Sequence, residues 1–108
     1  MKTMQMHTVQ GIHCTSVWSK IKGLMFSKPK VLIFHFAKPT RVSLHMWFVF
    51  FPIDLIFLDS KQRVIEIKKN FKPWRFYSSK QEAFFVIEVP TGYAATMHIG
   101  LQDTIIFK

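Results

Sequence analysis

Cysteine and acidic residues are scarce in this chain of 108 residues, and each scarcity narrows the class of protein. The single cysteine, Cys14, rules out an internal disulfide and therefore a disulfide scaffold. A reducing compartment suits such a chain, and we expect it in the cytoplasm. Only 6 acidic residues stand against 15 lysines and arginines, so the formal net charge is +9 at pH 7. This excess favours a polyanionic partner such as nucleic acid, although a basic surface also serves solubility alone.

Long uninterrupted apolar runs are missing as well. Residues 1–11 contain no continuous apolar core, so we expect no signal peptide. The most apolar stretch, residues 44–58, is interrupted by His45, Pro52 and Asp54. It also falls short of the roughly 20 residues that a membrane-spanning helix needs. We therefore expect a soluble protein without a transmembrane segment.

Apolar and aromatic residues are abundant. They make up 49% and 16% of the chain, with twelve phenylalanines, and this composition excludes a disordered protein. A chain of this length can bury a core without metals or disulfides. No repeat, low-complexity tract or Pro/Gly/Ser linker divides it. The expectation is a single domain over residues 1–108.

Short β-branched and aromatic runs predict a strand-rich fold. The polar segment Asp59–Gln62 between two such runs predicts a β-hairpin, and residues 70–81 are expected to form a loop. Thr15 or Ser16 is expected to cap one short helix, and Thr91 a second that ends at Gly100. The predicted strands are residues 4–12, 31–36, 44–50, 53–58, 63–69, 83–89 and 103–107. The first of them is expected to be weak and peripheral, and the second to end before Pro39. Their short connections indicate a mainly β, mostly antiparallel sandwich or jelly-roll-like barrel with two short helices.

A basic and aromatic segment is the best candidate for binding. Basic side chains are interleaved with aromatic rings through residues 68–77. The cations can therefore hold phosphates while the rings stack on unpaired bases. The candidate binding residues are Lys69, Lys72, Trp74, Arg75 and Tyr77. The alternative is structural, with Trp74 filling the sandwich and Arg75 stacked on its ring.

Asp54 and His45 are weak candidates for catalysis. A carboxylate at the head of an apolar strand gains a raised pKa when it is desolvated, which suits general acid or base chemistry. A histidine in the same pocket would titrate near neutrality. No serine or cysteine nucleophile stands at motif spacing beside them, so the pair lacks a mechanism. The alternative is that Asp54 accepts main-chain N–H bonds and fixes the bend after Pro52.

The histidines predict no metal site. Their spacing matches no zinc pattern, and the adjacent pair His13-Cys14 is not a chelating step. We expect no metal and no cofactor.

Several blocks together resemble domain-of-unknown-function family 192. They are Gly23 to Phe26, Phe51 to Asp59, Lys72 to Arg75, Val86 to Gly92 and Gly100 to Phe107. Their order agrees with the family from Ser16 onward. The resemblance implies a compact, mainly β, jelly-roll-like fold with a helix before the closing strand, and it implies no activity. Members often carry a methionine and a cation where this chain has Val49 and Phe50.

Two classes of function remain open from the sequence. One is a non-catalytic binding module for an anionic partner, nucleic acid or an acidic ligand. The other is a small enzyme, for example a hydrolase, with a pocket around His45 and Asp54. The oligomeric state and the ligand are not specified by these patterns.

Overall fold

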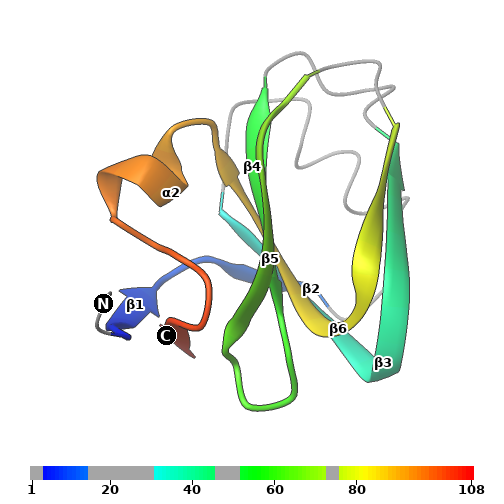
Figure 1. Ribbon diagram of the computed structural model, residues 1–108, viewed down its shortest axis with the longest axis horizontal. Helices are drawn as coiled ribbons and strands as arrows, with labels where there is room; N and C mark the ends of the chain where they lie inside the picture. The colour runs from blue at the N-terminus through cyan, green and yellow to red at the C-terminus, as the bar shows by residue number, and fades with distance from the viewer. Residues whose placement is uncertain (1–3, 15–30, 46–51, 73–75) are drawn as a thin grey trace.

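The chain folds into a mainly β structure, which confirms the predicted class. The computed structural model describes residues 4–14, 31–45, 52–72 and 76–108 (Figure 1). Its elements are β1 (Met6–Val9), β2 (Ile12–Cys14), β3 (Leu32–His45), β4 (Ile53–Leu58), β5 (Val64–Phe71), β6 (Phe76–Pro90), α2 (Tyr93–Thr96) and β7 (Thr104–Phe107). The predicted helix that begins at Thr15 or Ser16 lies outside the described residues, as do residues 46–50 of a predicted strand.

The described strands form two sheets. The larger has the order β2-β3-β6-β4-β5, and β1 pairs with β7 in a small second sheet. Since β2 and β5 are its two edges, the large sheet is not closed into a barrel. Its three central pairings are antiparallel as predicted, whereas β1–β7 and β2–β3 are parallel. Parallel partners need a long connection, and long segments do separate the members of both pairs.

The two longest strands run past the predicted breaks. The prediction that a strand ends before Pro39 is wrong, because β3 continues to His45. Its register with β6 is broken between His35 and Thr40, so the missing N–H of Pro39 costs no bond of the ladder. The predicted loop over residues 70–81 is also wrong in part. Residues 76–81 belong to β6, and within them Ser79 is buried while its neighbours Ser78 and Lys80 are exposed, as in a half-exposed strand.

The hairpin predicted around Asp59–Gln62 is confirmed. All six residues of β4 are buried, as expected for a central strand without a polar face. The turn is closed by main-chain bonds from Asp59 N to Arg63 O and from Gln62 N to Asp59 O. The Asp59 side chain accepts two further N–H bonds, from Lys61 and Arg63. Polar turn chemistry of this kind is local, which is why the sequence predicts it.

Two hydrophobic clusters lie on opposite faces of the large sheet. Alternate residues of β4 divide between them, with Leu55 and Phe57 in one cluster and Ile56 and Leu58 in the other. The second cluster is covered by α2 and by the β1–β7 sheet, which lie together on one side of Figure 1. The first lies where the bent half of β6 turns back over β5, and Tyr77 of β6 packs against it.

The short helix α2 is found near its predicted place but with other ends. It begins after Gly92, whose φ of 89° is a left-handed conformation that glycine adopts without strain. The predicted cap by Thr91 is wrong, since the N–H groups of Gly92 and Ala94 donate to the carboxylate of Asp54. The helix ends at Thr96 and not at Gly100.

Candidate functional site

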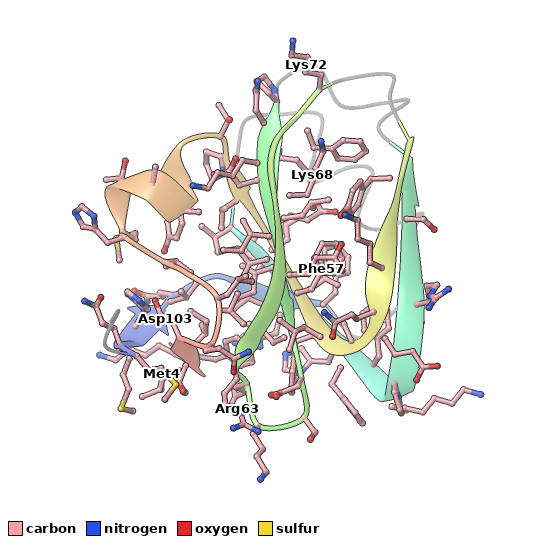
Figure 2. All side chains as sticks on the ribbon, viewed as in Figure 1. Met4, Phe57, Arg63, Lys68, Lys72 and Asp103 are labelled. Atoms are coloured by element: carbon pink, nitrogen blue, oxygen red, sulfur yellow. The ribbon has the colours of Figure 1, made fainter. Side chains whose placement is uncertain are left out.

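The predicted binding segment spans the end of β5 and the beginning of β6. Lys69 and Lys72 are exposed, and Lys72 lies at the far end of β5 from Arg63 (Figure 2). Tyr77 is half-buried at the start of β6. Trp74 and Arg75 lie outside the described residues. Three of the five predicted binding residues are therefore brought to one end of the molecule, and two of these are cations open to solvent.

Tyr77 joins the core to this basic end. Its ring lies 6.0 Å from that of Phe57 and 6.1 Å from that of Phe71, measured between centroids. The ammonium of Lys68 lies 5.6 Å from the ring centroid, a cation–π distance. Burial, followed by the hydrogen bond to Glu66, raises the pKa of Tyr77 to about 12. The ring is held by the core, so the exposed lysines are the part of the site that is free to meet a partner.

Glu66 fixes the bent half of β6 above β5. Its carboxylate accepts the hydroxyl of Tyr77 on one oxygen. The other oxygen accepts the main-chain N–H groups of Lys80 and Gln81, at 2.9 Å and 3.3 Å. Glu66 is buried, and such charge-assisted bonds compensate for the loss of its hydration. The residue therefore positions the strand that carries Tyr77.

Asp54, a weak catalytic candidate from the sequence, is surrounded by donors of the main chain. Oδ1 accepts Asn70 N at 2.9 Å, and Oδ2 accepts Gly92 N at 3.1 Å and Ala94 N at 3.2 Å. The hydroxyl of Thr91 donates to Oδ1 at 3.4 Å. With 1% of its surface exposed, the residue holds the end of β5 and the start of α2 together.

The sheet does not bring His45 beside Asp54 through neighbouring strands. His45 pairs with Phe76 at the start of β6, whereas Asp54 pairs with Val89 near its end. β6 stands between the two strands that carry them. The side chain of His45 lies outside what the structure describes, so the pair remains a prediction from the sequence.

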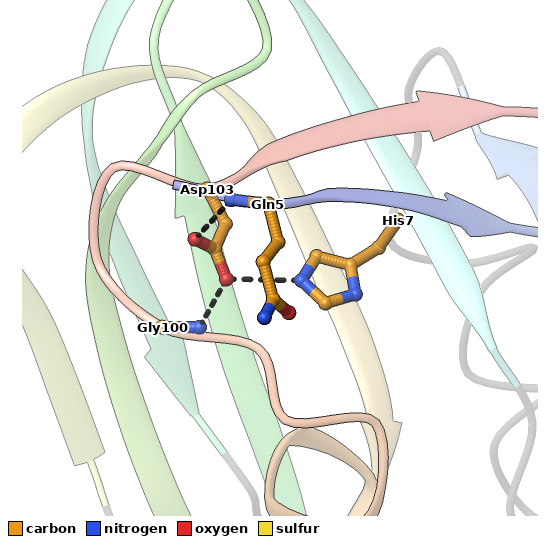
Figure 3. Close-up of polar contacts among 4 residues, drawn as sticks. All are labelled: Gln5, His7, Gly100 and Asp103. Atoms are coloured by element: carbon orange, nitrogen blue, oxygen red, sulfur yellow. Dashed lines mark hydrogen bonds and ion pairs between the residues drawn. The ribbon is translucent and has the colours of Figure 1, made fainter. Parts of the chain in front are cut away.

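A second buried carboxylate, Asp103, was missed by the sequence reasoning. Its Oδ2 atom lies 2.9 Å from His7 Nε2 and also accepts the main-chain N–H of Gly100. Its Oδ1 atom accepts the main-chain N–H of Gln5 at 3.0 Å. The three contacts are drawn in Figure 3. Asp103 is fully buried. The bonds tie the strand β1 to the turn before β7. Since 96 positions separate His7 from Asp103, no local signal could have revealed the pair.

A third missed carboxyl group, Glu88, has a different environment. It lies in β6 opposite Leu32 and Leu55, on the face of the first hydrophobic cluster, and 3% of its surface is exposed. None of the described residues forms a hydrogen bond with its Oε2 atom. Burial raises the pKa of Glu88 to about 8. The signal in the sequence is a lone acid within the apolar run Val86–Val89, which predicts a buried strand.

The described residues contain no group of three or more His, Cys, Asp or Glu side chains that could hold a metal ion. In the same part of the chain, no helix has the length and apolarity to cross a membrane.

Together these features define a class: a small, mainly β protein in which three buried acids accept main-chain N–H bonds and the described lysines, apart from Lys68, are exposed. Residues 2–107 match the model of family DUF192, described as "Uncharacterized ACR". The chain belongs to this family, as its sequence blocks predicted. The family match covers nearly the whole chain, and a single domain over residues 1–108 remains a prediction.

Two relatives agree with this membership. A UPF0127 protein of Pyrococcus horikoshii is 45% identical over 86 residues, which cover 77% of this chain and 74% of the relative. A UPF0127 protein of Thermococcus sibiricus is 38% identical over 93 residues, covering 82% of this chain but only 59% of the relative. The chain thus spans about three fifths of the latter protein's length.

The likeness to a solved structure concerns the fold alone. A protein of unknown function from Novosphingobium aromaticivorans superposes with a TM-score of 0.72 at 23% identity, over 94% of this chain and 73% of the other. The relatives and this structure carry no assigned activity in their descriptions.

Proposed function

We propose that this protein is a non-catalytic binding module for an anionic partner, nucleic acid or an acidic ligand. The observation that carries the proposal is the placement of its acids. Four of the six carboxyl groups in the chain are buried, and a fifth, Asp59, pairs with Arg63 at 3.3 Å. The buried four are Asp54, Glu66, Glu88 and Asp103. A polyanion approaching the surface therefore meets many cations and few competing carboxylates.

The exposed lysines at the end of β5 are the contact we assign to this partner. Lys69 and Lys72 are exposed to solvent, and Trp74 and Arg75 follow after Pro73 in the sequence. Lysines neutralise phosphates or carboxylates, and an aromatic ring or a guanidinium stacks on an unpaired base. A hydrolytic centre at His45 and Asp54 gains no such support, because the oxygens of Asp54 are occupied by main-chain donors.

Fluorescence anisotropy with labelled single-stranded and duplex oligonucleotides tests the proposal. We expect wild-type binding to weaken as salt rises, since the released counterions set the slope. The substitution Lys72→Ala should weaken binding and lower the salt slope by about one. Trp74→Ala and Arg75→Ala should weaken binding to the single strand more than to the duplex.

Lys61→Ala is the matched control, because it removes an exposed lysine at the opposite end of the β4–β5 hairpin. Equal losses from Lys61→Ala and Lys72→Ala would show unspecific attraction to a basic surface and would remove the assigned contact. Absence of binding to oligonucleotides and to an acidic peptide of equal charge would overturn the binding function itself.

A further inference from the structure

Two histidines far apart in the sequence meet on neighbouring strands. His13 lies on the edge strand β2 and His35 on β3, which pair in parallel with His13 opposite Ile33. Nδ1 of His13 is 2.8 Å from Nε2 of His35, and the ring centroids are 5.0 Å apart. His13 is exposed and His35 is partly buried. The two imidazoles thus lie side by side on the paired strands β2 and β3, at the surface.

The surroundings orient both rings. Nε2 of His13 donates to the main-chain carbonyl of Lys108 at 3.4 Å, which leaves Nδ1 as the acceptor toward His35. The ring of Phe107 lies 5.8 Å from that of His13 and 5.7 Å from that of His35, between centroids. Phe85 packs edge-on against His35 at 5.1 Å. A carbonyl on the far nitrogen and an apolar wall are the supports that metal-binding histidines commonly have.

We propose that His13 and His35 form a two-histidine site for a divalent transition-metal ion of the zinc, nickel or copper class. Two imidazole nitrogens bound tetrahedrally at about 2.0–2.1 Å lie about 3.3 Å apart, so the observed 2.8 Å needs to widen by only about half an ångström. The proton on Nε2 of His35 moves to Nδ1 of the same ring, and no proton is lost. Imidazole is the preferred ligand type for these ions.

The described residues provide no third side-chain ligand, so the open positions of the ion are left to water or an exchangeable ligand. The bound ion would also fasten β2, a strand of three residues, to β3. The site does not depend on the proposed binding of an anionic partner, because it lies on other strands than Lys69 and Lys72.

Calorimetric titration of the full chain with zinc chloride and with nickel chloride, at about pH 7.5, tests the site. We expect one ion per chain and a rise in Tm with added metal, because the ion binds only the folded protein. His13→Ala should weaken the affinity by at least about tenfold and abolish the rise in Tm. His13 is exposed, so this variant keeps the fold. His35→Ala should act in the same way.

His98→Asn is the matched control, because it removes an exposed histidine elsewhere whose φ of 56° asparagine tolerates. A Cys14→Ser variant shows whether the lone thiol takes part, and we expect it to bind as wild type does. The proposal is overturned if wild type binds neither ion, if His13→Ala binds as well as His98→Asn, or if Cys14→Ser alone removes the binding.

Discussion

At the scale of single residues, the buried carboxyl groups divide into two kinds. Asp54, Glu66 and Asp103 each accept at least two main-chain N–H bonds, which replace the water that burial removes. Glu88 lies among leucines, and the described residues provide no donor to its Oε2 atom. The first three therefore support the fold through these bonds, whereas burial raises the pKa of Glu88 to about 8.

The stability of the protein should depend on pH through Glu88. Its pKa is about 8 in the folded chain against an ordinary 4.5, so the folded state holds a proton that the unfolded state releases between these values. The free energy of unfolding therefore falls as pH rises from about 4.5 to about 8. Glu88→Met should remove this slope and raise stability at pH 7, by an amount on the order of 2–3 kcal/mol. Urea denaturation at several pH values measures the effect.

Glu82→Met is the control for that experiment, because Glu82 is exposed on the same strand. It should leave the pH profile unchanged. If Glu88→Met and wild type keep parallel profiles across this range, Glu88 is not the isolated carboxyl that its environment indicates.

At the scale of elements, Gly11 is the joint between the two sheets. It separates β1, in the small sheet, from β2, at the edge of the large one. The chain passes so close to Val31 here that a Cβ on Gly11 would stand 2.5 Å from Val31 Cγ1 and 2.7 Å from the Val31 carbonyl oxygen. The neighbouring bond from Ile12 N to Val31 O, 2.9 Å long, depends on this approach.

We expect Gly11→Ala to destabilise the protein by about 1–3 kcal/mol, because the methyl group forces β2 away from β3. Thermal denaturation followed by circular dichroism measures the loss. Gln10→Ala, an exposed change at the next position, should cost little. Equal stability of Gly11→Ala and wild type would mean that the approach to Val31 is not needed. Since β2 carries His13, the variant should also bind zinc more weakly.

At the scale of the whole molecule, acidic side chains are mostly buried and basic side chains are mostly at the surface. The formal net charge is +9, and four of the six acids are buried while many cations face solvent. Among the described residues, the exposed lysines and arginine outside the Asp59–Arg63 pair are Lys38, Arg41, Lys61, Lys69, Lys72, Lys80 and Lys108. Like charges on one surface repel, which lowers stability and at the same time attracts polyanions.

Stability should therefore rise with ionic strength. Raising sodium chloride from about 20 mM to about 500 mM shortens the Debye length from about 20 Å to a few ångströms and screens the repulsion. We expect Tm to increase over this range. Lys72→Glu should raise Tm at low salt and reduce the salt effect, and a fall of Tm with salt would contradict this account. Differential scanning fluorimetry in matched buffers is sufficient.

Much of the fold was predictable from local patterns. The apolar run of β4, the polar turn Asp59–Gln62 and the alternation along β5 each specify their own structure within a few residues, and the structure has them where they were predicted. The breaks expected at Pro39 and over residues 76–81 were wrong, because a bulge in β3 and the pairing of β6 with β3 override local propensity.

By itself, the sequence determined that this chain is basic, free of disulfides, mainly β and a member of its family. Only the tertiary structure decided which acids are buried, that His7 meets Asp103, and that His13 meets His35. These contacts depend on the order and register of strands that lie far apart along the chain, and local periodicity carries no information about either.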